Sequence, residues 1–587
     1  MRRPIVAGLA FALTLAVAAV FSAGSGTAQD SGVTNEVYFP WVPVGEEVDS
    51  EISIQNLDYD VTAVVEVYTG VGTSDAAFES SFVVELQPRE SLTVTADQLD
   101  IDEPGTSVIV ATEADDPAAG GPAEIAAVLK TEVDEAGDDE GSNDDTSVEA
   151  AQADDDADDS GDRRGPPDHA RGRGGPDISV DLPDQASDRA RANVPGADDE
   201  DEEADDDAPV DPALNAIDGY NGMTPEEVVE VDTQVLPIVQ TGEGWETNLY
   251  FAHLDMNGGA QSNVTVTALS ESGEEEPVEN FTMSPGEVEV YELTDLLSEG
   301  SDTFTGSVRI DSNAPVAAVS ERRNLEESLS LSNTSTPDDF GDGLKHASLV
   351  IPDEPGWTST LNLLNTTLDE VSASVEYLSK DGGSLGGDQY DIGASELLRI
   401  DFPSDEDGPI EVSSVLVTSD PAVQGSVDLI NPDADTADGP IGMTYELTSK
   451  TAAVGDRLGV PLVQKVNPNA EYGSTTEIHL FNPTSSEVDA EVTFYGANGN
   501  PAHPTVDEGN NPDPIVITID GFESASLSTA DDILDGMIDG FERGAVIDVV
   551  APNGGVVGGG EVIGVATNVT EMADGDRGVT HRLHPHP

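Results

Sequence analysis

Hydrophobic and polar positions alternate over short stretches of this chain, and the same alternation recurs along it. GEGWETNLYF at residues 242–251 returns as EPGWTSTLNL at residues 354–363. Three copies carry an anchor residue followed four and six positions later by apolar residues: Val48, Ile52 and Ile54; Trp245, Leu249 and Phe251; Trp357, Leu361 and Leu363. Even spacings place side chains on one face of a strand, because successive residues point to opposite faces. The pattern therefore predicts β-strands with one buried face.

A fourth copy contains two extra residues after Tyr472, and its apolar pair, Ile478 and Leu480, keeps the same parity. An asparagine ends the strand in three of the four copies: Asn56, Asn365 and Asn482. His253 takes this place in the second copy. Asparagine side chains bond to nearby backbone in turns, so we expect a turn directly after each of these strands.

Further strand patterns follow each start. Runs such as VTAVVEVYTG from Val61 and VDAEVTFYGANG from Val488 are rich in β-branched residues and end in turn residues, and each copy closes on one or two more such runs. Each copy thus holds about six or seven strands in roughly 100 to 120 residues. The predicted fold class is all-β, with tandem immunoglobulin/fibronectin-like β-sandwiches and a long disordered acidic linker. One short stretch, STADDILDGMI from Ser528, has the pattern of a helix start.

The predicted organisation is a signal peptide (1–28), sandwich 1 (29–131), a disordered acidic linker (132–217), sandwich 2 (218–335), sandwich 3 (336–452), sandwich 4 (453–572) and a flexible C-terminal tail (573–587). The signal peptide is expected because Arg2 and Arg3 precede an apolar run over residues 5–21, and small residues precede Ala28. We therefore expect a secreted protein, extracellular or at the cell surface.

The charge balance limits the partners. The chain has 118 acidic residues against 22 Lys plus Arg, a formal net charge of −96. Nucleic acids and anionic membrane surfaces are excluded, because both require clustered basic residues. Repulsion on this scale favours a protein that works in high salt or with divalent cations. The alternative is an ordinary secreted protein with an acidic, solubilising surface. The chain has no cysteine, so disulfides cannot stabilise it.

The acidic linker has a composition of its own. Between Glu132 and Asp211 there are 30 acidic residues and 6 arginines, with almost no large apolar side chains. Such a segment cannot form a core, so we expect disorder. Four of its arginines lie between Asp162 and Gly175, either as a protease-sensitive site or as local charge neutralisation.

No catalytic motif is present in the sequence. Neither G-x-S-x-G nor H-E-x-x-H occurs, and the eight histidines are scattered. A glycosidase needs only two carboxylates, and the abundance of acidic residues prevents any pair from being singled out. We therefore predict no enzyme, with an extracellular hydrolase that uses an unrecognised carboxylate site as an alternative.

Two acidic stretches suggest calcium, the one cofactor considered. NPDADTADG and DDFGDG combine oxygen-bearing side chains with a glycine bend, as calcium loops do. The candidate ligands are Asn431, Asp433, Asp435 and Asp438 in the first and Asp338, Asp339 and Asp342 in the second. Both stretches follow the last predicted strand of a copy, where an ion could stiffen a joint between sandwiches. Neither has the complete twelve-residue loop pattern, and solvated linkers are the alternative.

The leader, the repeated strands GWETNL and GWTSTL and the acidic tether resemble secreted tandem immunoglobulin-like β-sandwich repeat proteins of prokaryotic cell envelopes. The resemblance implies a noncatalytic protein of envelope structure, adhesion or extracellular matrix, with envelope proteins, polysaccharides or divalent cations as partners. The alternative is an extracellular protein that binds carbohydrate or protein. Trp245 and Trp357 are most simply core residues; an aromatic platform for a ligand, to which Trp41 could also contribute, is the alternative.

Overall fold

The computed structural model describes residues 36–586 apart from 134–216 and shorter gaps. The gaps of six residues or more are 72–78, 114–122, 224–232, 255–260, 338–343, 349–356, 403–411, 432–440, 450–456, 466–472, 503–513, 530–540 and 553–561. The predicted signal peptide, nearly all of the predicted acidic linker and the predicted helix after Thr529 lie outside the described residues.

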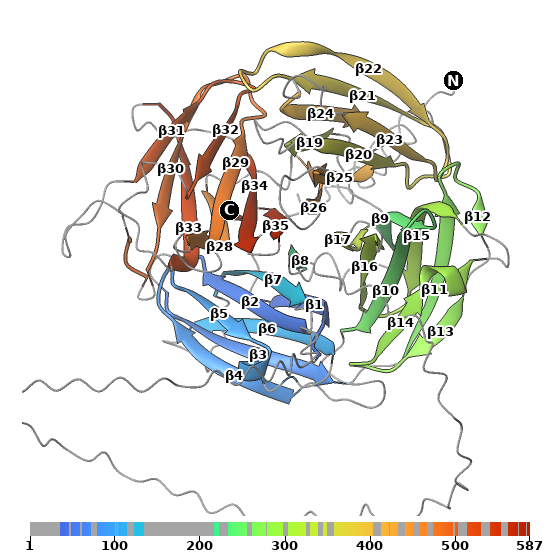
Figure 1. The fold of residues 1–587 in the computed structure, drawn as a ribbon, viewed down its shortest axis with the longest axis horizontal. Helices are drawn as coiled ribbons and strands as arrows, with labels where there is room; N and C mark the ends of the chain where they lie inside the picture. The colour runs from blue at the N-terminus through green and yellow to red at the C-terminus, as the bar shows by residue number, and fades with distance from the viewer. Residues whose placement is uncertain are drawn as a thin grey trace, which may run out of the picture. The chain divides into compact units, whose positions relative to one another are not determined.

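The prediction of an all-β chain is confirmed. Antiparallel strands make up nearly all regular structure in the described ranges, whose helical segments are η1 (Asp97–Leu99) and α3 (Leu293–Leu296). Neither is long and apolar enough to cross a membrane. We call the four repeated groups of strands modules 1 to 4 (Figure 1).

Each module has two sheets. One sheet of module 1 has the strand order β1 (Glu36–Val42), β6 (Gly105–Glu113), β3 (Ala63–Val71) and β4 (Glu79–Leu86). The other has the order β5 (Ser91–Thr95), β2 (Val48–Asn56), β7 (Ile125–Val133) and β8 (Ile217–Asn221). One sheet of module 2 has the strand order β18 (Thr336–Pro337), β9 (Thr233–Thr241), β15 (Phe304–Ser312) and β11 (Ser262–Ser270), and β11 pairs in turn with both β12 (Glu275–Glu276) and β13 (Asn280–Met283). The other sheet has the order β14 (Val288–Glu292), β10 (Trp245–His253), β16 (Val316–Asn324) and β17 (Leu329–Thr334).

The later modules repeat this plan. Module 3 has β27 (Thr448–Ser449), β19 (Leu344–Ser348), β24 (Ser414–Ser419), β21 (Val371–Leu378) and β22 (Ser384–Ile392), and β23 (Leu397–Phe402), β20 (Thr358–Leu364), β25 (Gln424–Asn431) and β26 (Ile441–Glu446). Module 4 has β36 (His584–His586), β28 (Arg457–Lys465), β33 (Phe541–Val550), β30 (Val488–Phe494) and β31 (Ile515–Ile519), and β32 (Ser524–Ser528), β29 (Gly473–Phe481), β34 (Ile563–Met572) and β35 (Gly575–Arg582). The residues assigned to a C-terminal tail thus include two strands.

The strand order is the same in every module. The first strand pairs with the sixth, which pairs with the third; the second pairs with the fifth and the seventh, and the seventh with the eighth. Immunoglobulin constant domains place their first two strands in one sheet. Here the first and second strands belong to different sheets, joined in module 4 by one residue pair, Lys465 with Thr475.

The predicted alternation builds the cores. β21 alternates buried and exposed residues along almost its whole length, as expected of a sheet with one solvated face. Each module has a cluster of buried apolar residues from both sheets, and Ile52, Phe251, Leu361 and Ile478 are each at most 1% exposed. The repeated apolar positions therefore face the inside of a sandwich.

The acidic segment begins and ends in module 1. β7 precedes it and β8 follows it, and the two pair antiparallel, with Leu129 opposite Tyr220. Met223 also pairs with Tyr38 of β1. The predicted boundaries at 131/132 and 217/218 cut through this strand pair. The segment is therefore inserted within one module, between its seventh and eighth strands.

The asparagine turns are confirmed. Each asparagine Nδ2 donates to three backbone carbonyls, and each Oδ1 accepts from the N–H two residues later. These side chains are 0% exposed: Asn56, Asn365 and Asn482. The turn thus links the end of the second strand to the segment before the third and to the turn before the fifth.

A second repeated turn, before the fifth strand, was not predicted. A glutamate carboxylate accepts from the backbone N–H three residues earlier in each module, at Glu90, Glu287, Glu396 and Glu523. The preceding residue has a φ between 56° and 79°: Arg89, Gly286, Ser395 and Phe522. Three of these are not glycine, so the hydrogen-bonded turn holds side chains in a conformation that they rarely adopt.

This turn is also where neighbouring modules meet. The turn after the third strand of one module lies against it, and a Cβ at Gly273 would be 2.2 Å from the carbonyl oxygen of Ala394. At Gly382 the corresponding distance is 2.8 Å to Gly521, and at Gly499 it is 2.2 Å to Pro88. All three glycines also have positive φ. Backbone packing at these junctions therefore leaves no room for a side chain.

The contacts between modules close a cycle. The side-chain contacts are Trp41 with Tyr250, Arg322 with Asp428, Ser414 with Ser524, and Gln55 with the carbonyl of Ala545. Module 4 therefore returns to module 1, and each module contacts two others. The eighth strands of the modules, β8, β17, β26 and β35, also contact one another in this order, with β35 against β8.

Candidate functional site

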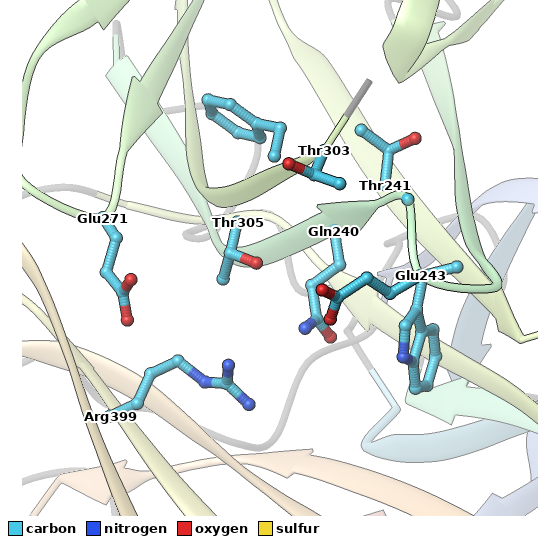
Figure 2. A pocket seen from close by; sticks show the side chains of 10 residues that line it. Gln240, Thr241, Glu243, Glu271, Thr303, Thr305 and Arg399 are labelled. Carbon is cyan, nitrogen blue, oxygen red and sulfur yellow. The ribbon is translucent and has the colours of Figure 1, made fainter. Parts of the chain in front are cut away.

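A polar cleft of about 340 Å³ lies at the junction of modules 2 and 3. It is lined by Gln240, Thr241, Gly242, Glu243, Trp245, Glu271, Thr303, Phe304, Thr305 and Arg399. Figure 2 shows the side chains of Gln240, Glu243, Glu271 and Arg399 reaching into one space. The cleft thus gathers an amide, two carboxylates, threonine hydroxyls and a guanidinium.

The hairpin between β9 and β10 supplies one wall. Gly242 and Trp245 bond to each other through both backbone groups, at 2.8 and 3.1 Å. The two residues between them, Glu243 and Gly244, have φ of 55° and 87°. Positive φ at both central residues defines a type I′ turn, which usually takes Asn-Gly or Gly-Gly. A glutamate in this place is strained by about 1 kcal/mol, and its carboxylate is carried on a rigid turn.

The other wall comes from module 3. Arg399 lies on β23, and the N–H of Leu397 on the same strand donates to the carbonyl of Glu271 at 3.0 Å. This bond fixes the first residue of the strand against module 2. Glu271 and Arg399, which are far apart in the sequence, therefore line the same cleft.

Arg399 differs from the other described arginines of its modules. Arg309, Arg322 and Arg323 each lie within 4 Å of a carboxylate. Arg399 has no ion pair or hydrogen-bond partner among the described residues, and its Nε is buried. In a chain with more than five times as many acidic as basic residues, a guanidinium without a carboxylate is available for a ligand.

Beside the cleft lies a buried ion pair between the same two modules. Arg322 of β16 is 0% exposed, and its Nη1 and Nη2 donate to the two carboxylate oxygens of Asp428 on β25, at 2.9 and 2.6 Å. Asn333 accepts a further bond from Arg322 at 3.0 Å. Thr444 and Asn362 donate to the Asp428 carboxylate at 2.8 and 3.1 Å. The bidentate geometry and the added bonds are what a buried pair requires.

The surroundings of Asp428 act in opposite directions on its pKa. Burial raises it, but the charge of Arg322 and the hydrogen bonds from Arg322, Thr444 and Asn362 outweigh burial, so the pKa lies below the ordinary value. Asp428 is therefore ionised near neutral pH and holds the junction as a carboxylate.

Gln240 connects the ion pair to the cleft. Its Oε1 accepts from Arg322 Nη1 at 3.2 Å, and Gln240 also lines the cleft. From the other side, Arg399 is the strand partner of Asn362, which donates to Asp428. Each wall of the cleft is thus linked to the buried ion pair: Gln240 contacts Arg322 directly, and Arg399 is connected to Asp428 through Asn362.

Only one of the seven predicted calcium ligands, Asn431, lies within the described residues. Asn431 ends β25, is buried and pairs with Ile441. The other calcium candidates, Asp433, Asp435, Asp438, Asp338, Asp339 and Asp342, lie outside the described residues. Within the described ranges no group of three or more His, Cys, Asp or Glu is placed to hold a metal ion.

The tryptophans occupy three different environments. Trp357 is 5% exposed within the core of module 3, which supports the core interpretation and rules out a surface platform there. Trp41 is half-buried and stacks on Tyr250 of module 2, with ring centroids 4.3 Å apart. Trp245 is half-buried and lines the cleft. Trp245 and Trp357, which share a position in the repeat, therefore lie in a cleft in one module and in a core in the next.

Sequence reasoning missed Arg322, Arg399 and Gln240. The one available signal was rarity, since only 22 basic residues occur in the chain and several arginines stand inside strands. An arginine in a strand of an acidic protein is expected to have a specific partner or ligand. Which carboxylate or cleft each one meets depends on how the modules pack.

Comparison with known proteins shows little. Scans against protein-family models and against curated sequences found no match. Among solved structures, a β-glucuronidase of Bacteroides uniformis is 13% identical over 36% of this chain and 26% of its own, with a TM-score of 0.11. The BSP domain of a biofilm-associated protein is 10% identical over 96% of this chain and 95% of its own, with a TM-score of 0.13. A viral chemokine-binding protein encoded by rodent gammaherpesvirus Peru is 10% identical over 63% and 89%, with a TM-score of 0.14. TM-scores this low carry no argument about this chain.

Proposed function

We propose that this chain is a secreted, noncatalytic structural or adhesion protein of a cell envelope or extracellular matrix, adapted to high salt or divalent cations. The observation that carries the proposal is the cycle of contacts between modules. Junctions built on close backbone packing and a buried ion pair produce one stiff unit, which is what a load-bearing or surface-displayed protein requires. We further propose that each module is a variant of the immunoglobulin-like sandwich in which the first, fourth and seventh strands have each changed sheet.

The charge supports the proposed environment. A net charge of −96 destabilises a compact chain at low ionic strength, and salt screens this repulsion. Exposed strands also pair threonine with aspartate, as between Thr360, which donates, and Asp401 at 2.9 Å. Calcium held by the acidic stretch at residues 338–342, between modules 2 and 3, and by the stretch at residues 431–438 belongs to the same proposal, with envelope proteins or polysaccharides as partners. The second stretch follows β25 and precedes β26, so it lies within module 3 and not between modules as expected.

The test is location and loss of function in the source cells. Antibodies against the purified chain should label the surface of intact cells or the matrix between them. Deletion of the gene should weaken cell aggregation or envelope integrity, and restoring the full chain should reverse this effect. A protein retained inside cells, or a deletion without effect on aggregation or the envelope, would contradict the proposal.

A binding protein is the second candidate, and the cleft between modules 2 and 3 is the observation that favours it. The cleft combines a guanidinium that has no ion-pair partner among the described residues with hydrogen-bonding groups on a rigid support. The hydrolase alternative gains no support, because the β-glucuronidase similarities have TM-scores of 0.11 or lower.

A further inference from the structure

Among the fifth strands of the four modules, that of module 3 is the one with an arginine at its third position. Arg399 occupies the third position of the fifth strand in module 3, opposite Asn362. The equivalent position holds Thr93 in module 1, Val290 in module 2 and Ser526 in module 4. Strand formation and junction packing therefore do not require an arginine here, and its presence calls for a separate reason.

We propose that the cleft at the junction of modules 2 and 3 binds a saccharide unit that carries a carboxylate. The carboxylate of the sugar lies on Arg399, and its hydroxyl groups bond to Glu243, Glu271 and Gln240. This inference goes beyond the structural role and does not depend on it.

Arg399 selects the anion. A guanidinium is a planar fork that binds a carboxylate through two parallel hydrogen bonds. Arg399 lines the cleft and has no ion pair among the described residues, so a bound carboxylate would supply the acceptors that its guanidinium lacks there. The ligand is thus expected to carry a negative charge despite the negative charge of the chain.

Glu243 and Glu271 limit what that anion can be. Both are exposed and line the same cleft as Arg399. A doubly charged phosphate would meet repulsion from two carboxylates, whereas a singly charged carboxylate on a hydroxyl-rich body offers them donors instead. Ionised glutamates only accept hydrogen bonds, and sugar hydroxyls can supply several such bonds. A metal cation is disfavoured in turn by the guanidinium.

Shape and preorganisation agree with this ligand. A volume of about 340 Å³ is at the small end of ligand sites and suits one or two sugar units. Trp245 provides an apolar edge of the kind that packs against a sugar ring. Glu243 is held by its type I′ turn and Gln240 by the bond from Arg322, so little ordering is required when a ligand binds.

The experiment is calorimetric titration of the full mature chain in about 1 M salt, where long-range repulsion is screened. The probes are oligosaccharides of galacturonate, glucuronate, mannuronate and guluronate, with neutral oligosaccharides of matched length and linkage. We expect at least one acidic probe to bind and its neutral counterpart to bind roughly tenfold more weakly or not at all. Arg399→Gln should weaken the acidic probe by a similar factor.

Arg309→Gln is the matched control, because Arg309 is a surface arginine of module 2 paired with Glu275 and Asp311. It should leave binding unchanged, and both variants should unfold at the temperature of the unchanged chain. Absence of binding by every acidic probe, equal binding of neutral probes, or full binding by Arg399→Gln would each overturn the proposal. Arg399-dependent binding of acidic peptides but of no acidic saccharide would overturn it as well.

Discussion

Replacing Arg322 with methionine tests the junction of modules 2 and 3 directly. The substitution keeps most of the buried volume and removes four hydrogen bonds: two to Asp428, one to Gln240 and one to Asn333. Asp428 keeps its bonds from Thr444 and Asn362 but loses its counter-charge while 4% exposed. Removing one partner of a buried pair costs about 3 to 5 kcal/mol of unfolding free energy near neutral pH, and we expect a loss in this range.

The loss should depend on pH in a defined direction. In the unchanged chain the pKa of Asp428 is lowered. The stability from the pair is therefore present above the ordinary aspartate pKa of about 3.9 and is lost as the pH falls through the lower folded-state pKa. In Arg322→Met burial is no longer opposed by a positive charge, so the pKa of Asp428 rises. The penalty in the variant then shrinks on acidification, and the difference between the two proteins narrows from pH 7 toward pH 4.

The assay is urea unfolding in about 1 M salt, followed by tryptophan fluorescence at several pH values. Urea is uncharged, so the screening stays constant during the titration. Arg323→Met is the matched control, because Arg323 adjoins Arg322 on β16 but pairs with Glu321 in a partly exposed position; it should cost at most about 1 kcal/mol. A loss below about 1 kcal/mol for Arg322→Met, an equal loss for the control, or a penalty that does not change with pH would refute the reasoning.

Three further predictions concern the turns and the ionic environment. Gly382→Ala should lower the unfolding free energy measured in urea titrations by more than about 1 kcal/mol, because a Cβ would lie 2.8 Å from the carbonyl oxygen of Gly521. Gly45→Ala is the control and should be neutral, because the nearest atom to its Cβ is 3.8 Å away. Equal effects of the two substitutions would contradict the packing argument. Asn365→Ala leaves one buried and two partly buried carbonyls without their shared donor. It should cost about 3 kcal/mol of unfolding free energy by the same assay, and a cost below about 1 kcal/mol would show that the turn is redundant. Raising the salt concentration from about 0.1 to about 1 M should raise the midpoint temperature of thermal unfolding, and chelating calcium should lower it. A midpoint that responds to neither treatment would count against both haloadaptation and calcium binding.

Local features of this protein were predictable. The alternation around Leu361 predicted a strand with one buried face, and β20 has that face in the core of module 3. The turns at Asn365 and Asn482 were predictable for the same reason, since an asparagine side chain bonds to backbone only a few residues away. Glu396 has an equally local role, and its repetition before each fifth strand was a signal that could have been used.

The candidate site was not predictable from the same patterns. Arg322 and Asp428 are 106 residues apart, and no local period indicates that they meet. The calcium hypothesis relied on composition within short stretches, and most of its residues lie outside the described ranges. Trp245 and Trp357 share a place in the repeat yet differ in exposure, because a cleft forms beside one and a core beside the other.

The sequence by itself determined the strands, their buried faces and their fourfold repetition, because a strand buried on one face needs only a period of two residues. The tertiary structure decided that β8 belongs with β7 across the acidic insertion, that module 4 returns to module 1, and that Arg399 meets no carboxylate among the residues that the structure describes. These features depend on which surfaces pack together, and packing is set by the summed fit of residues distant in the chain.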